Sequence, residues 1–430
     1  MAEDYKVKQV KEVKKIEIDV PGSKSITNRA LLLAALSKGK CKLNGVLFSD
    51  DSRAFLDCLI KLGFEIDVNE ERKEVLIGGL GGEIPNRNAT INVRSAGTAA
   101  RFLTAMLAFA GGDYVLQSSG QMKKRPMKQL IDSLRSLGVT VNCFEEEGHF
   151  PFEIHSSGIN SNEVEIDTTI SSQFVSALLM SGVLVPEGLK IKMSGSRTKG
   201  SYIKLTLAMM KQFGIDVLCE NDRLVVCHNS NYSVSTYDIE PDLSAACYFY
   251  AMSPLLGTDV IVKNVYSNSI QGDIKFLEVL KQMGCSMKET DRGICVKGIK
   301  DRKYPGVTVD MNDFSDQTMT LAAIAPFASS KTIIKNISHI RFQETDRISA
   351  IVNELTRLGV KCEESEEYKG ICIYPGEIVP AAVETYDDHR MAMAFTLIGL
   401  RIGDITIKNY KCCAKTFENY FDIIDKLTEE

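Results

Sequence analysis

Residues 20–40 read VPGSKSITNRALLLAALSKGK, in which a Pro-Gly turn leads through a polar cluster directly into an apolar helix. Lys24 and Arg29 lie in this cluster among serine, threonine and asparagine residues, and no carboxylate occurs between Val20 and Ser49. A helix that is apolar nearly all round belongs in the middle of a core, and the free N–H groups at its start attract an anion. The stretch therefore predicts a buried helix with either a simple cap or an anion site at its N-terminus.

The same theme occurs six times along the chain, each time as a small or polar cluster followed by an apolar helix. The six copies read SKSITNRALLLAALSKG, SAGTAARFLTAMLAFAGG, TTISSQFVSALLMSG, PDLSAACYFYAMSPLLG, FSDQTMTLAAIAPFASS and YDDHRMAMAFTLIGLRIG. Comparable points recur roughly every 70–76 residues, at Ser25, Ser95, Ser171, Ser244, Asp316 and Asp388.

A second theme fills the intervals: an amphipathic helix that ends in Leu-Gly or a similar pair, followed by a short hairpin. It is carried by LIKLGFEIDV, LRSLGVTVNC, MKQFGIDVLC, LKQMGCSMKE and LTRLGVKCEE. The glycines predicted as C-caps are Gly63, Gly138, Gly214, Gly284 and Gly359. The sixth helix, TFENYFDIIDKL, has no hairpin after it, and the alternating N-terminal stretch KVKQVKEVKKIEIDV is expected to supply the missing strand.

Six α/β units predict an α/β fold with two similar lobes of three units each. Turn residues at Pro21-Gly22 and Glu240-Pro241-Asp242 mark the expected crossings. The first lobe is then 21–240, and the second is discontinuous, 1–20 with 241–430. One large α/β sheet, or a two-domain enzyme without symmetry, is the alternative. If the buried helices in a lobe are parallel, their N-termini gather on one face.

Composition excludes several classes of function. The 430-residue chain carries a net charge of −5, which argues against a nucleic-acid partner because such proteins present a basic face. The 12 cysteines form no C-x-x-C pair, and the five histidines show no i,i+4 pairing, so neither a disulfide framework nor a metal site is expected. The N-terminus lacks an apolar signal region, and no apolar run approaches the ~20 residues of a membrane span. We expect a soluble, cytoplasmic protein that has no membrane partner.

Familiar nucleotide and hydrolase motifs are missing. Lys24 follows a serine without the upstream glycine of G-x-x-x-x-G-K-[ST], and IGGLGGE (77–83) does not complete G-x-G-x-x-G, so we interpret it as a turn. Neither G-x-S-x-G nor H-E-x-x-H occurs. These absences argue against the common nucleotide enzymes.

Cations stand beside the predicted helix starts, as capture of carboxylates and phosphates requires. They are Lys24, Arg29, Arg101, Lys123, Lys124, Arg125, Arg347, Arg390 and Lys415. Any one of them could instead be a solvated side chain. That alternative is weakest for Arg29, Arg347 and Arg390, which begin apolar helices, whereas Lys123 and Lys124 could form only a charged turn.

Carboxylates at the same positions could act as acids or bases. They are Asp316, Glu344, Asp346, Asp387 and Asp388, the last beside His389. For Asp316, Asp346 and Asp388 the alternative is a plain N-cap. Glu344 is least like a cap and is close to Arg347 in sequence, which suggests either a local ion pair or a carboxylate within an anion site.

Eight segments, in this order, resemble the 5-enolpyruvylshikimate-3-phosphate synthase (3-phosphoshikimate 1-carboxyvinyltransferase) family between about Ile16 and Ile424. They are PGSKSITNRALLLAAL, SAGTAARFLTAML, KKRPM, ISSQFVSALLM, DQTMTLAAIA, QETDRI, DDHRMAMA and AKTFENYF. The resemblance implies two inside-out α/β lobes, each of three βαβαββ repeats with buried parallel helices, joined by two crossover strands, and an active site in the cleft between them.

The resemblance also implies a reaction. The carboxyvinyl group of phosphoenolpyruvate is transferred to the 5-hydroxyl of shikimate 3-phosphate, with release of phosphate, through a tetrahedral intermediate in the shikimate pathway. A monomer without cofactor or metal is expected. The first lobe mainly holds shikimate 3-phosphate and the second mainly holds phosphoenolpyruvate.

Matching positions carry the family's site residues over to this chain. Shikimate 3-phosphate is expected at Lys24, Ser25, Arg29, Ser171, Ser172, Gln173, Tyr202, Asp316 and Gln343. Phosphoenolpyruvate is expected at Lys24, Gly97, Arg125, Gln173, Arg347, Arg390 and Lys415. Asp316 would help to remove the proton of the 5-hydroxyl. Glu344 would carry a proton to the methylene carbon, and Lys24 would assist the leaving phosphate.

Several positions depart from the commonest family pattern, namely Ser95 for Asn, Phe102 for Pro, Lys199 for Ser, His339 for Asn and Gln343 for Lys. The nearest rival is UDP-N-acetylglucosamine carboxyvinyltransferase, which usually opens with a Gly-Ala-Lys-Asn type motif. RNA 3′-phosphate cyclase, which would need a nucleotide site, and a catalytically inactive binding module are more distant alternatives.

Overall fold

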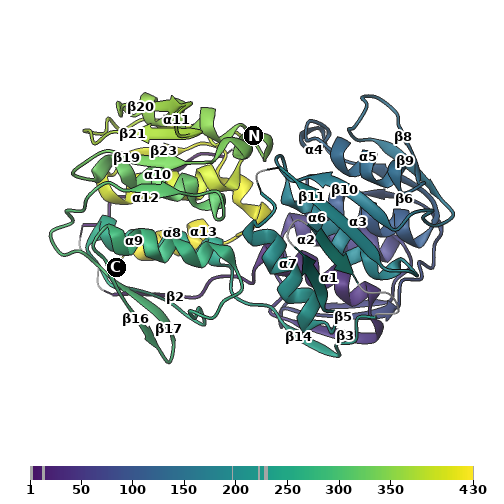
Figure 1. The fold of residues 1–430 in the computed structure, drawn as a ribbon. Coiled ribbons are helices and arrows are strands. Elements are labelled where there is room, and N and C mark those ends of the chain that lie inside the picture. The colour runs from purple at the N-terminus through teal and green to yellow at the C-terminus, as the bar shows by residue number, and fades with distance from the viewer. Residues whose placement is uncertain (1–2, 12–14, 196, 221–222, 227–230, 430) are drawn as a thin grey trace. The chain divides into compact units, whose positions relative to one another are not determined.

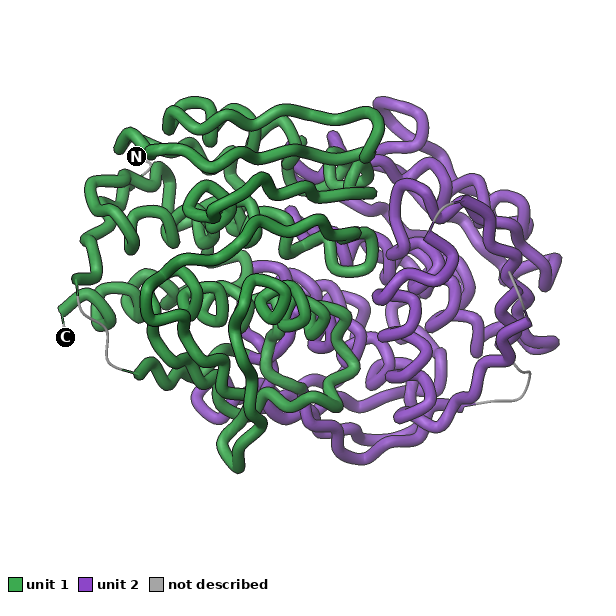
Figure 2. Tube along the Cα trace, turned by 60° about the vertical axis from the view of Figure 1, so that its left-hand side comes forward, with its two compact units in different colours: residues 1–21, 240–430 green, residues 22–239 purple. Residues whose placement is uncertain are grey.

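The computed structural model describes residues 3–11, 15–195, 197–220, 223–226 and 231–429. Contacts within the chain divide it into two compact units (Figures 1 and 2). Unit 1 comprises residues 1–21 and 240–430, and unit 2 comprises residues 22–239. The chain passes from one unit to the other at Pro21-Gly22 and at Ile239-Glu240, so each unit is described separately below.

Unit 2 contains three four-stranded sheets around buried helices. In order of pairing, the first sheet consists of β6 (Asn88–Asn92), β7 (Gly112–Gln117), β9 (Phe152–Ser156) and β8 (Thr140–Cys143). The second consists of β10 (Glu163–Asp167), β11 (Leu189–Ser194), β13 (Arg223–Val226) and β12 (Val217–Glu220). The third consists of β14 (Thr236–Asp238), β3 (Lys38–Asn44), β5 (Glu74–Leu80) and β4 (Ile66–Asn69). Its helices are α1 (Lys24–Leu36), α2 (Asp50–Lys61), α3 (Gly97–Ala110), α4 (Gly120–Lys123), α5 (Lys128–Ser136), α6 (Ser172–Ser181) and α7 (Ser201–Gln212).

Unit 1 repeats this plan with one shorter sheet. In order of pairing, the first sheet consists of β16 (Ser286–Thr290), β17 (Gly293–Lys297), β15 (Val260–Val262) and β2 (Ile16–Ile18). The second consists of β18 (Thr308–Asp310), β19 (Thr332–Lys335), β21 (Gly370–Ile373) and β20 (Cys362–Ser365). The third consists of β1 (Tyr5–Val7), β23 (Ile405–Ile407) and β22 (Ala382–Val383). Its helices are α8 (Leu243–Leu256), α9 (Phe276–Gln282), α10 (Thr318–Ile324), α11 (Arg347–Arg357), α12 (His389–Ile402) and α13 (Tyr420–Glu429).

The apolar helices form the interior of each unit, as the sequence predicts. Helices α1, α3 and α6 pack together in unit 2, and α8, α10 and α12 in unit 1 (Figure 1). In four of the sheets, the strand before such a helix pairs in parallel with the strand after it. The sheets that contain β3 and β15 are each completed instead by a parallel strand from far along the chain, β14 and β2 respectively. The parallel crossovers orient the buried helices alike, so the fold is the predicted α/β arrangement with helices inside and sheets outside.

The N-terminal stretch does complete the last sheet, but by a route that differs from the prediction. We expected one alternating strand over KVKQVKEVKKIEIDV, whereas the structure forms two short strands in different sheets, and residues 12–14 lie outside its description. Strand β1 pairs antiparallel with β23, and β2 pairs in parallel with β15. The sheet that lacks a hairpin is therefore closed by a strand some 400 positions away in sequence.

Turn residues behave mostly as predicted. All five C-cap glycines have φ values of 80–101°, the left-handed region that favours glycine. The interpretation of 77–83 as a turn is wrong in part, because β5 extends to Leu80 and only Gly81 and Gly82 turn, with φ of 64° and 102°. The predicted helix in FSDQTMTLAAIAPFASS is also interrupted: α10 lies between two 3₁₀ turns, the second of which contains Pro326.

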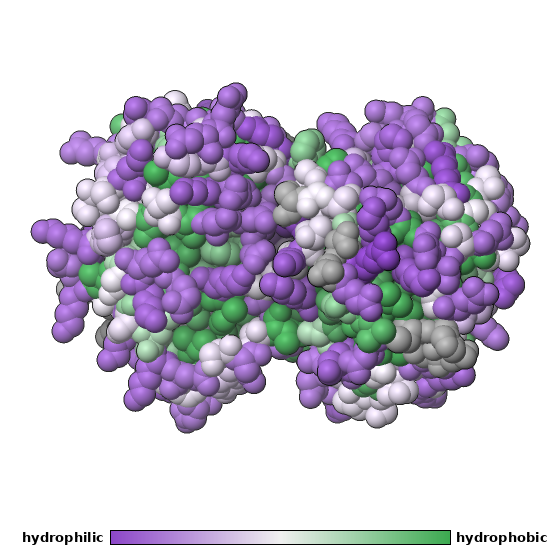
Figure 3. All heavy atoms as spheres, viewed as in Figure 1, coloured by the Kyte–Doolittle hydropathy of each residue, from purple (hydrophilic) through white to green (hydrophobic). Residues whose placement is uncertain are grey.

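Hydrophilic residues predominate on the face of each unit that Figure 3 shows, with smaller apolar areas between them. Within the described ranges, no helix combines the length and the apolar character that crossing a membrane needs. Every described cysteine is free, and Cys58, Cys247 and Cys372 are buried, which is typical of thiols that pack in a core.

Candidate active site

The N-termini of the three buried helices in unit 1 converge on Arg390, in the first turn of α12. Its Nη2 donates to Asp316 Oδ2 at 2.8 Å and to Ser244 Oγ, in the first turn of α8, at 3.4 Å. Asp316 belongs to the 3₁₀ turn η3 (Ser315–Gln317) that leads into α10. The repeated sequence theme therefore gathers its polar clusters at one place in this unit.

Arg347, the first residue of α11, lies at the centre of this cluster. It is 1% exposed and donates to Asp388 through Nε (2.8 Å) and Nη2 (3.3 Å). It also donates to Asp316 Oδ1 at 3.1 Å and to Glu344 Oε2 at 2.9 Å. Gln343 Oε1 accepts a further bond from Nη1. One guanidinium thus links three carboxylates that come from three parts of the chain.

The charges in this cluster support one another. Burial opposes the charged form of Arg347, but the carboxylates of Asp388, Glu344 and Asp316 outweigh it and raise the pKa of the guanidinium. Asp273, in the short turn η2 (Gly272–Lys275), is also buried and accepts from Gln317 Nε2 at 2.8 Å. Burial, and then the charge of Asp316, raise the pKa of Asp273 to about 6.

Lys415 adds a third cation, from the turn η6 (Tyr410–Lys415). Its Nζ lies 3.6 Å from Glu344 Oε1 and is buried, yet it makes no hydrogen bond to any residue that the structure describes. A buried ammonium with unused donors suits an anionic ligand. The interactions above join all six residues that the family resemblance assigns to this unit: Asp316, Gln343, Glu344, Arg347, Arg390 and Lys415.

The plain N-cap alternative holds for two of the three aspartates. Asp346 caps α11 by accepting from Ser349 N at 3.1 Å, and Asp388 caps α12 by accepting from Arg390 N at 2.9 Å. The alternative is wrong for Asp316, because Gln317 occupies the N-cap position of α10 and makes no side-chain cap bond. Asp388 combines a cap with the ion pair to Arg347, and Asp316 bridges Arg347 and Arg390.

In unit 2, Arg29 lies 1% exposed among α1, α6 and α7. Its guanidinium donates to Thr206 Oγ1 (2.8 Å), Ser176 Oγ (3.3 Å), and the carbonyls of Ser25 (3.0 Å) and Tyr202 (3.4 Å). Burial lowers the pKa of Arg29 to about 10. The structure thus gives Arg29 a helix-linking role that sequence reasoning did not include, and it joins Arg29 to the predicted site residues Ser25 and Tyr202.

The start of α3 is another basic site in this unit. A Cβ on Gly97 would lie 2.6 Å from Arg125 Nη1 and 2.9 Å from Arg101 Nη1, so only glycine leaves room for both guanidiniums. Arg125 is buried, whereas Lys123 forms a surface ion pair with Glu145 at 2.6 Å. Of the KKRPM cations, Arg125 therefore fits a site, and Lys123 belongs to a charged surface.

The remaining predicted residues of unit 2 also stand at helix starts. Lys24 is the first residue of α1, and its Nζ lies 3.7 Å from Asp51 Oδ2. Ser171 caps α6 by accepting from Gln173 N at 3.2 Å, and Ser172 is the buried first residue of that helix. Tyr202 is the second residue of α7. Helix N-termini thus position Lys24, Ser171, Ser172 and Tyr202.

Sequence reasoning missed two carboxylates. Asp51 stands beside Lys24, and Asp273 stands beside the Asp316 turn. Both lie in the first turn of a helical segment, which was a weak signal because aspartate is common at helix starts for its effect on the helix alone.

The departures from the family pattern have ordinary partners. Ser95 Oγ lies 2.7 Å from Ser119 Oγ, and His339 Nε2 lies 2.8 Å from Ser315 Oγ. The Phe102 ring packs against Arg29, whose Cζ lies 5.2 Å from the ring centre. Lys199 is exposed. None of these contacts displaces a neighbouring residue of the predicted site.

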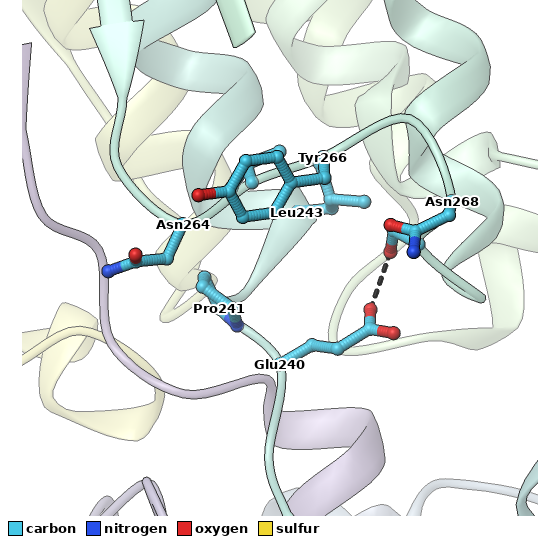
Figure 4. A pocket seen from close by; sticks show the side chains of 8 residues that line it. Glu240, Pro241, Leu243, Asn264, Tyr266 and Asn268 are labelled. Atoms are coloured by element: carbon cyan, nitrogen blue, oxygen red, sulfur yellow. Dashed lines mark hydrogen bonds between the residues drawn. The ribbon is translucent and has the colours of Figure 1, made fainter. Parts of the chain in front are cut away.

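Two further features of the described residues bear on ligands. No group of three or more metal-ligating side chains occurs among them. A cavity of about 220 Å³ in unit 1 is lined by Glu240, Pro241, Leu243, Asn264, Val265, Tyr266, Asn268 and Ser269 (Figure 4). The Glu240 carboxylate already accepts from Ser269 Oγ at 2.5 Å and Gln271 Nε2 at 2.9 Å. This cavity contains none of the predicted site residues.

Comparison with known proteins gives one consistent result. A model of the family "EPSP synthase (3-phosphoshikimate 1-carboxyvinyltransferase)" matches residues 7–424. Proteins named 3-phosphoshikimate 1-carboxyvinyltransferase are 42% identical over 414 residues in Nostoc punctiforme (96% of each chain) and 39% identical over 422 residues in Vibrio vulnificus (97% of this chain, 98% of that one).

The fold agrees as well. The solved structure of EPSP synthase from Acinetobacter baumannii superposes with a TM-score of 0.81 at 24% identity, covering 99% of this chain and 98% of that one. Together with the match along nearly the whole sequence, this shows that the chain belongs to the EPSP synthase (3-phosphoshikimate 1-carboxyvinyltransferase) family.

Proposed function

We propose that this protein transfers the carboxyvinyl group of phosphoenolpyruvate to the 5-hydroxyl of shikimate 3-phosphate, releasing phosphate and 5-enolpyruvylshikimate 3-phosphate. The names of its full-length relatives support the reaction. In this role it acts in the shikimate pathway, as a cytoplasmic monomer that needs neither metal nor cofactor.

One observation carries the proposal: the cluster of unit 1 combines buried cations with carboxylates. Arg347, Arg390 and Lys415 can neutralise a ligand that bears a phosphate and a carboxylate. Asp316 and Glu344 lie within the same cluster, at 2.8 Å from Arg390 and 2.9 Å from Arg347. A site that only stored anions would gain nothing from carboxylates there, because they repel an anionic ligand, whereas a site that moves protons needs them.

The proposal divides substrate binding between the two units. Shikimate 3-phosphate is held mainly by unit 2, through Lys24, Ser25, Arg29, Ser171, Ser172, Gln173 and Tyr202, with Asp316 and Gln343 from unit 1. Phosphoenolpyruvate is held mainly by unit 1, through Arg347, Arg390 and Lys415, with Lys24, Gly97, Arg125 and Gln173 from unit 2.

The chemistry follows addition and elimination. Asp316 accepts the proton of the 5-hydroxyl while the hydroxyl oxygen attacks C2 of phosphoenolpyruvate. Glu344 delivers a proton to C3, which becomes a methyl group. The product of this step is a tetrahedral ketal phosphate. The Glu344 carboxylate then takes a proton back from the methyl group, which reforms the C2–C3 double bond as the C2–O bond to phosphate breaks, with Lys24 donating a proton to the leaving group. Each positioned acid or base contributes about 10²–10⁴ in rate.

Phosphate release tests the reaction. Purified protein is incubated with phosphoenolpyruvate and either shikimate 3-phosphate or UDP-N-acetylglucosamine, and free phosphate is measured. Release with shikimate 3-phosphate alone supports the proposal. Release only with the sugar nucleotide would overturn it in favour of the rival transferase.

Two substitutions test the assigned roles. Glu344→Gln and Lys24→Met are each expected to lower kcat at least about 100-fold while the protein stays folded. Lys263→Met is a suitable control, because it removes a lysine from an exposed ion pair with Asp19. Near-normal kcat in either test variant would remove that residue from the mechanism.

A further inference from the structure

Helix α11 holds the segment 384–388 at two points. Arg347, in its first turn, binds the Asp388 carboxylate. Glu354 lies seven residues later, on the same face of the helix, and binds the beginning of the same segment. The first contact belongs to the cluster described above, whereas the mechanism leaves Glu354 without a role.

Glu354 is a fully buried carboxylate whose oxygens are well used. It accepts from Tyr386 Oη at 2.7 Å and from the backbone N–H of Glu384 at 3.0 Å. It also accepts from Arg357 Nε at 3.1 Å and Nη2 at 3.4 Å. Burying a charge is unfavourable without such partners, and two of the donors come from the segment that leads to Asp388.

That segment has a strained backbone. Tyr386 and Asp387 have φ values of 53° and 57°, in the left-handed region that side-chain-bearing residues rarely adopt. Two such residues in succession persist only where the surroundings enforce them. The bond from Tyr386 Oη to Glu354 enforces the first, and the bond from Asn409 Nδ2 to Asp387 Oδ1, at 3.0 Å, enforces the second.

The strained turn determines where Asp388 points. Asp388 N donates to the carbonyl of Thr385 at 2.8 Å, which closes the turn. The Asp388 side chain then caps α12 through Arg390 N and binds Arg347. Both of these arginines are proposed ligands of phosphoenolpyruvate, so the geometry of the turn sets the geometry of the anion site.

We infer that Glu354 is a positioning residue for phosphoenolpyruvate, holding the strained 384–388 turn through Tyr386 and Glu384 so that Asp388 aligns Arg347 and Arg390. This role rests on the proposed function, because it concerns the substrate that those cations bind. Glu354 itself does not touch substrate, and it acts entirely through the turn.

Kinetics of Glu354→Gln and Tyr386→Phe test the inference. Gln keeps the size of the side chain but removes its charge, and Phe removes only the hydroxyl. We expect KM for phosphoenolpyruvate to rise about tenfold or more, because small misplacements of positioning groups have effects of this size, while KM for shikimate 3-phosphate stays within about twofold. The double variant should show less than the product of the two effects, because both break one link.

Tyr374→Phe is the matched control. It removes a Tyr–Glu hydrogen bond of similar length, 2.6 Å to Glu363, in the same unit but away from the turn. Its two KM values should equal those of the wild type. If Glu354→Gln and Tyr386→Phe lower the thermal midpoint but leave KM for phosphoenolpyruvate unchanged, or raise both KM values equally, Glu354 is merely structural and the inference is overturned.

Amide hydrogen exchange separates this inference from the proposed function. The N–H of Arg390 is bonded to Asp388 Oδ1 at 2.9 Å and should exchange about tenfold faster in either variant than in the wild type. This readout needs no substrate. Unchanged exchange at Arg390 would refute the inference even in an active enzyme, whereas faster exchange in a protein that releases no phosphate would leave the turn assignment standing and refute the function alone.

Discussion

Replacing Arg347 with methionine tests how far unit 1 depends on a single guanidinium. Methionine fills much of the same space but carries no charge. The change removes all hydrogen bonds that Arg347 makes to Asp388, Asp316 and Glu344. Two of these carboxylates keep another cation nearby, since Arg390 lies 2.8 Å from Asp316 and Lys415 lies 3.6 Å from Glu344.

The cost is therefore concentrated at Asp388. This carboxylate is fully buried and keeps the cap bond to Arg390 N at 2.9 Å after the substitution. Removing one partner of a buried ion pair destabilises a protein by about 3–5 kcal/mol. For a unit of this size, each kcal/mol shifts the midpoint by roughly 2–4 °C, so Arg347→Met should lower the midpoint of unit 1 by roughly 6–20 °C.

Differential scanning calorimetry without substrates measures this shift. Arg347→Lys should fall between the wild type and Arg347→Met, because lysine keeps the charge but cannot bind Asp388 with two donors. Lys263→Met provides the control: its ion pair with Asp19 is largely exposed, at 2.8 Å, and should contribute less than about 1 kcal/mol. A midpoint for Arg347→Met no lower than that of this control would refute the reasoning about the buried cluster.

Two further substitutions give independent tests. Gly97→Ala places a Cβ 2.6 Å from Arg125 Nη1, so the guanidinium must move. In steady-state assays KM for phosphoenolpyruvate should therefore rise about tenfold, with little change in thermal midpoint. An unchanged KM would show that the start of α3 is not part of the site. Asp273→Asn tests the buried acid whose pKa is raised to about 6 by burial and by Asp316. Since the folded-state pKa lies above the unfolded one, ionised Asp273 opposes folding in full at pH above about 6, and this opposition fades as the pH falls from there through the ordinary value of 3.8. Thermal midpoints should therefore favour Asp273→Asn over the wild type at pH 8 and do so by much less at pH 4.5, and an equal difference at both pH values would contradict the assignment.

The cluster also explains how an acidic protein can bind anionic substrates. The chain has a net charge of −5, so the overall field does not attract anions. In the proposed site, binding depends instead on buried cations, whose interactions with an anion are stronger than in water because they are desolvated. Among these cations Arg347 is 1% exposed, and the carboxylates of Asp388, Glu344 and Asp316 raise its pKa, which favours its charged form.

Local sequence patterns were enough to define the repeated architecture and the helix starts. The apolar helices, the glycine C-caps and the polar clusters are local features, because period, cap and turn chemistry depend on residues a few positions apart. For this reason the sequence places Lys24, Ser171 and Arg390 at helix N-termini, and the structure confirms all three positions.

Which of those groups meet depends on tertiary packing. Arg347 joins Asp388 across 41 positions, and β1 completes a sheet with β23 from the other end of the chain. Neither link leaves a periodic trace in the sequence, because contacts between distant positions arise from packing rather than from local propensity. The same holds for the left-handed turn at Tyr386, a residue whose own preference is against that conformation. Its bond to the buried Glu354 helps to hold the turn, in which Asp388 faces the arginine that begins α11.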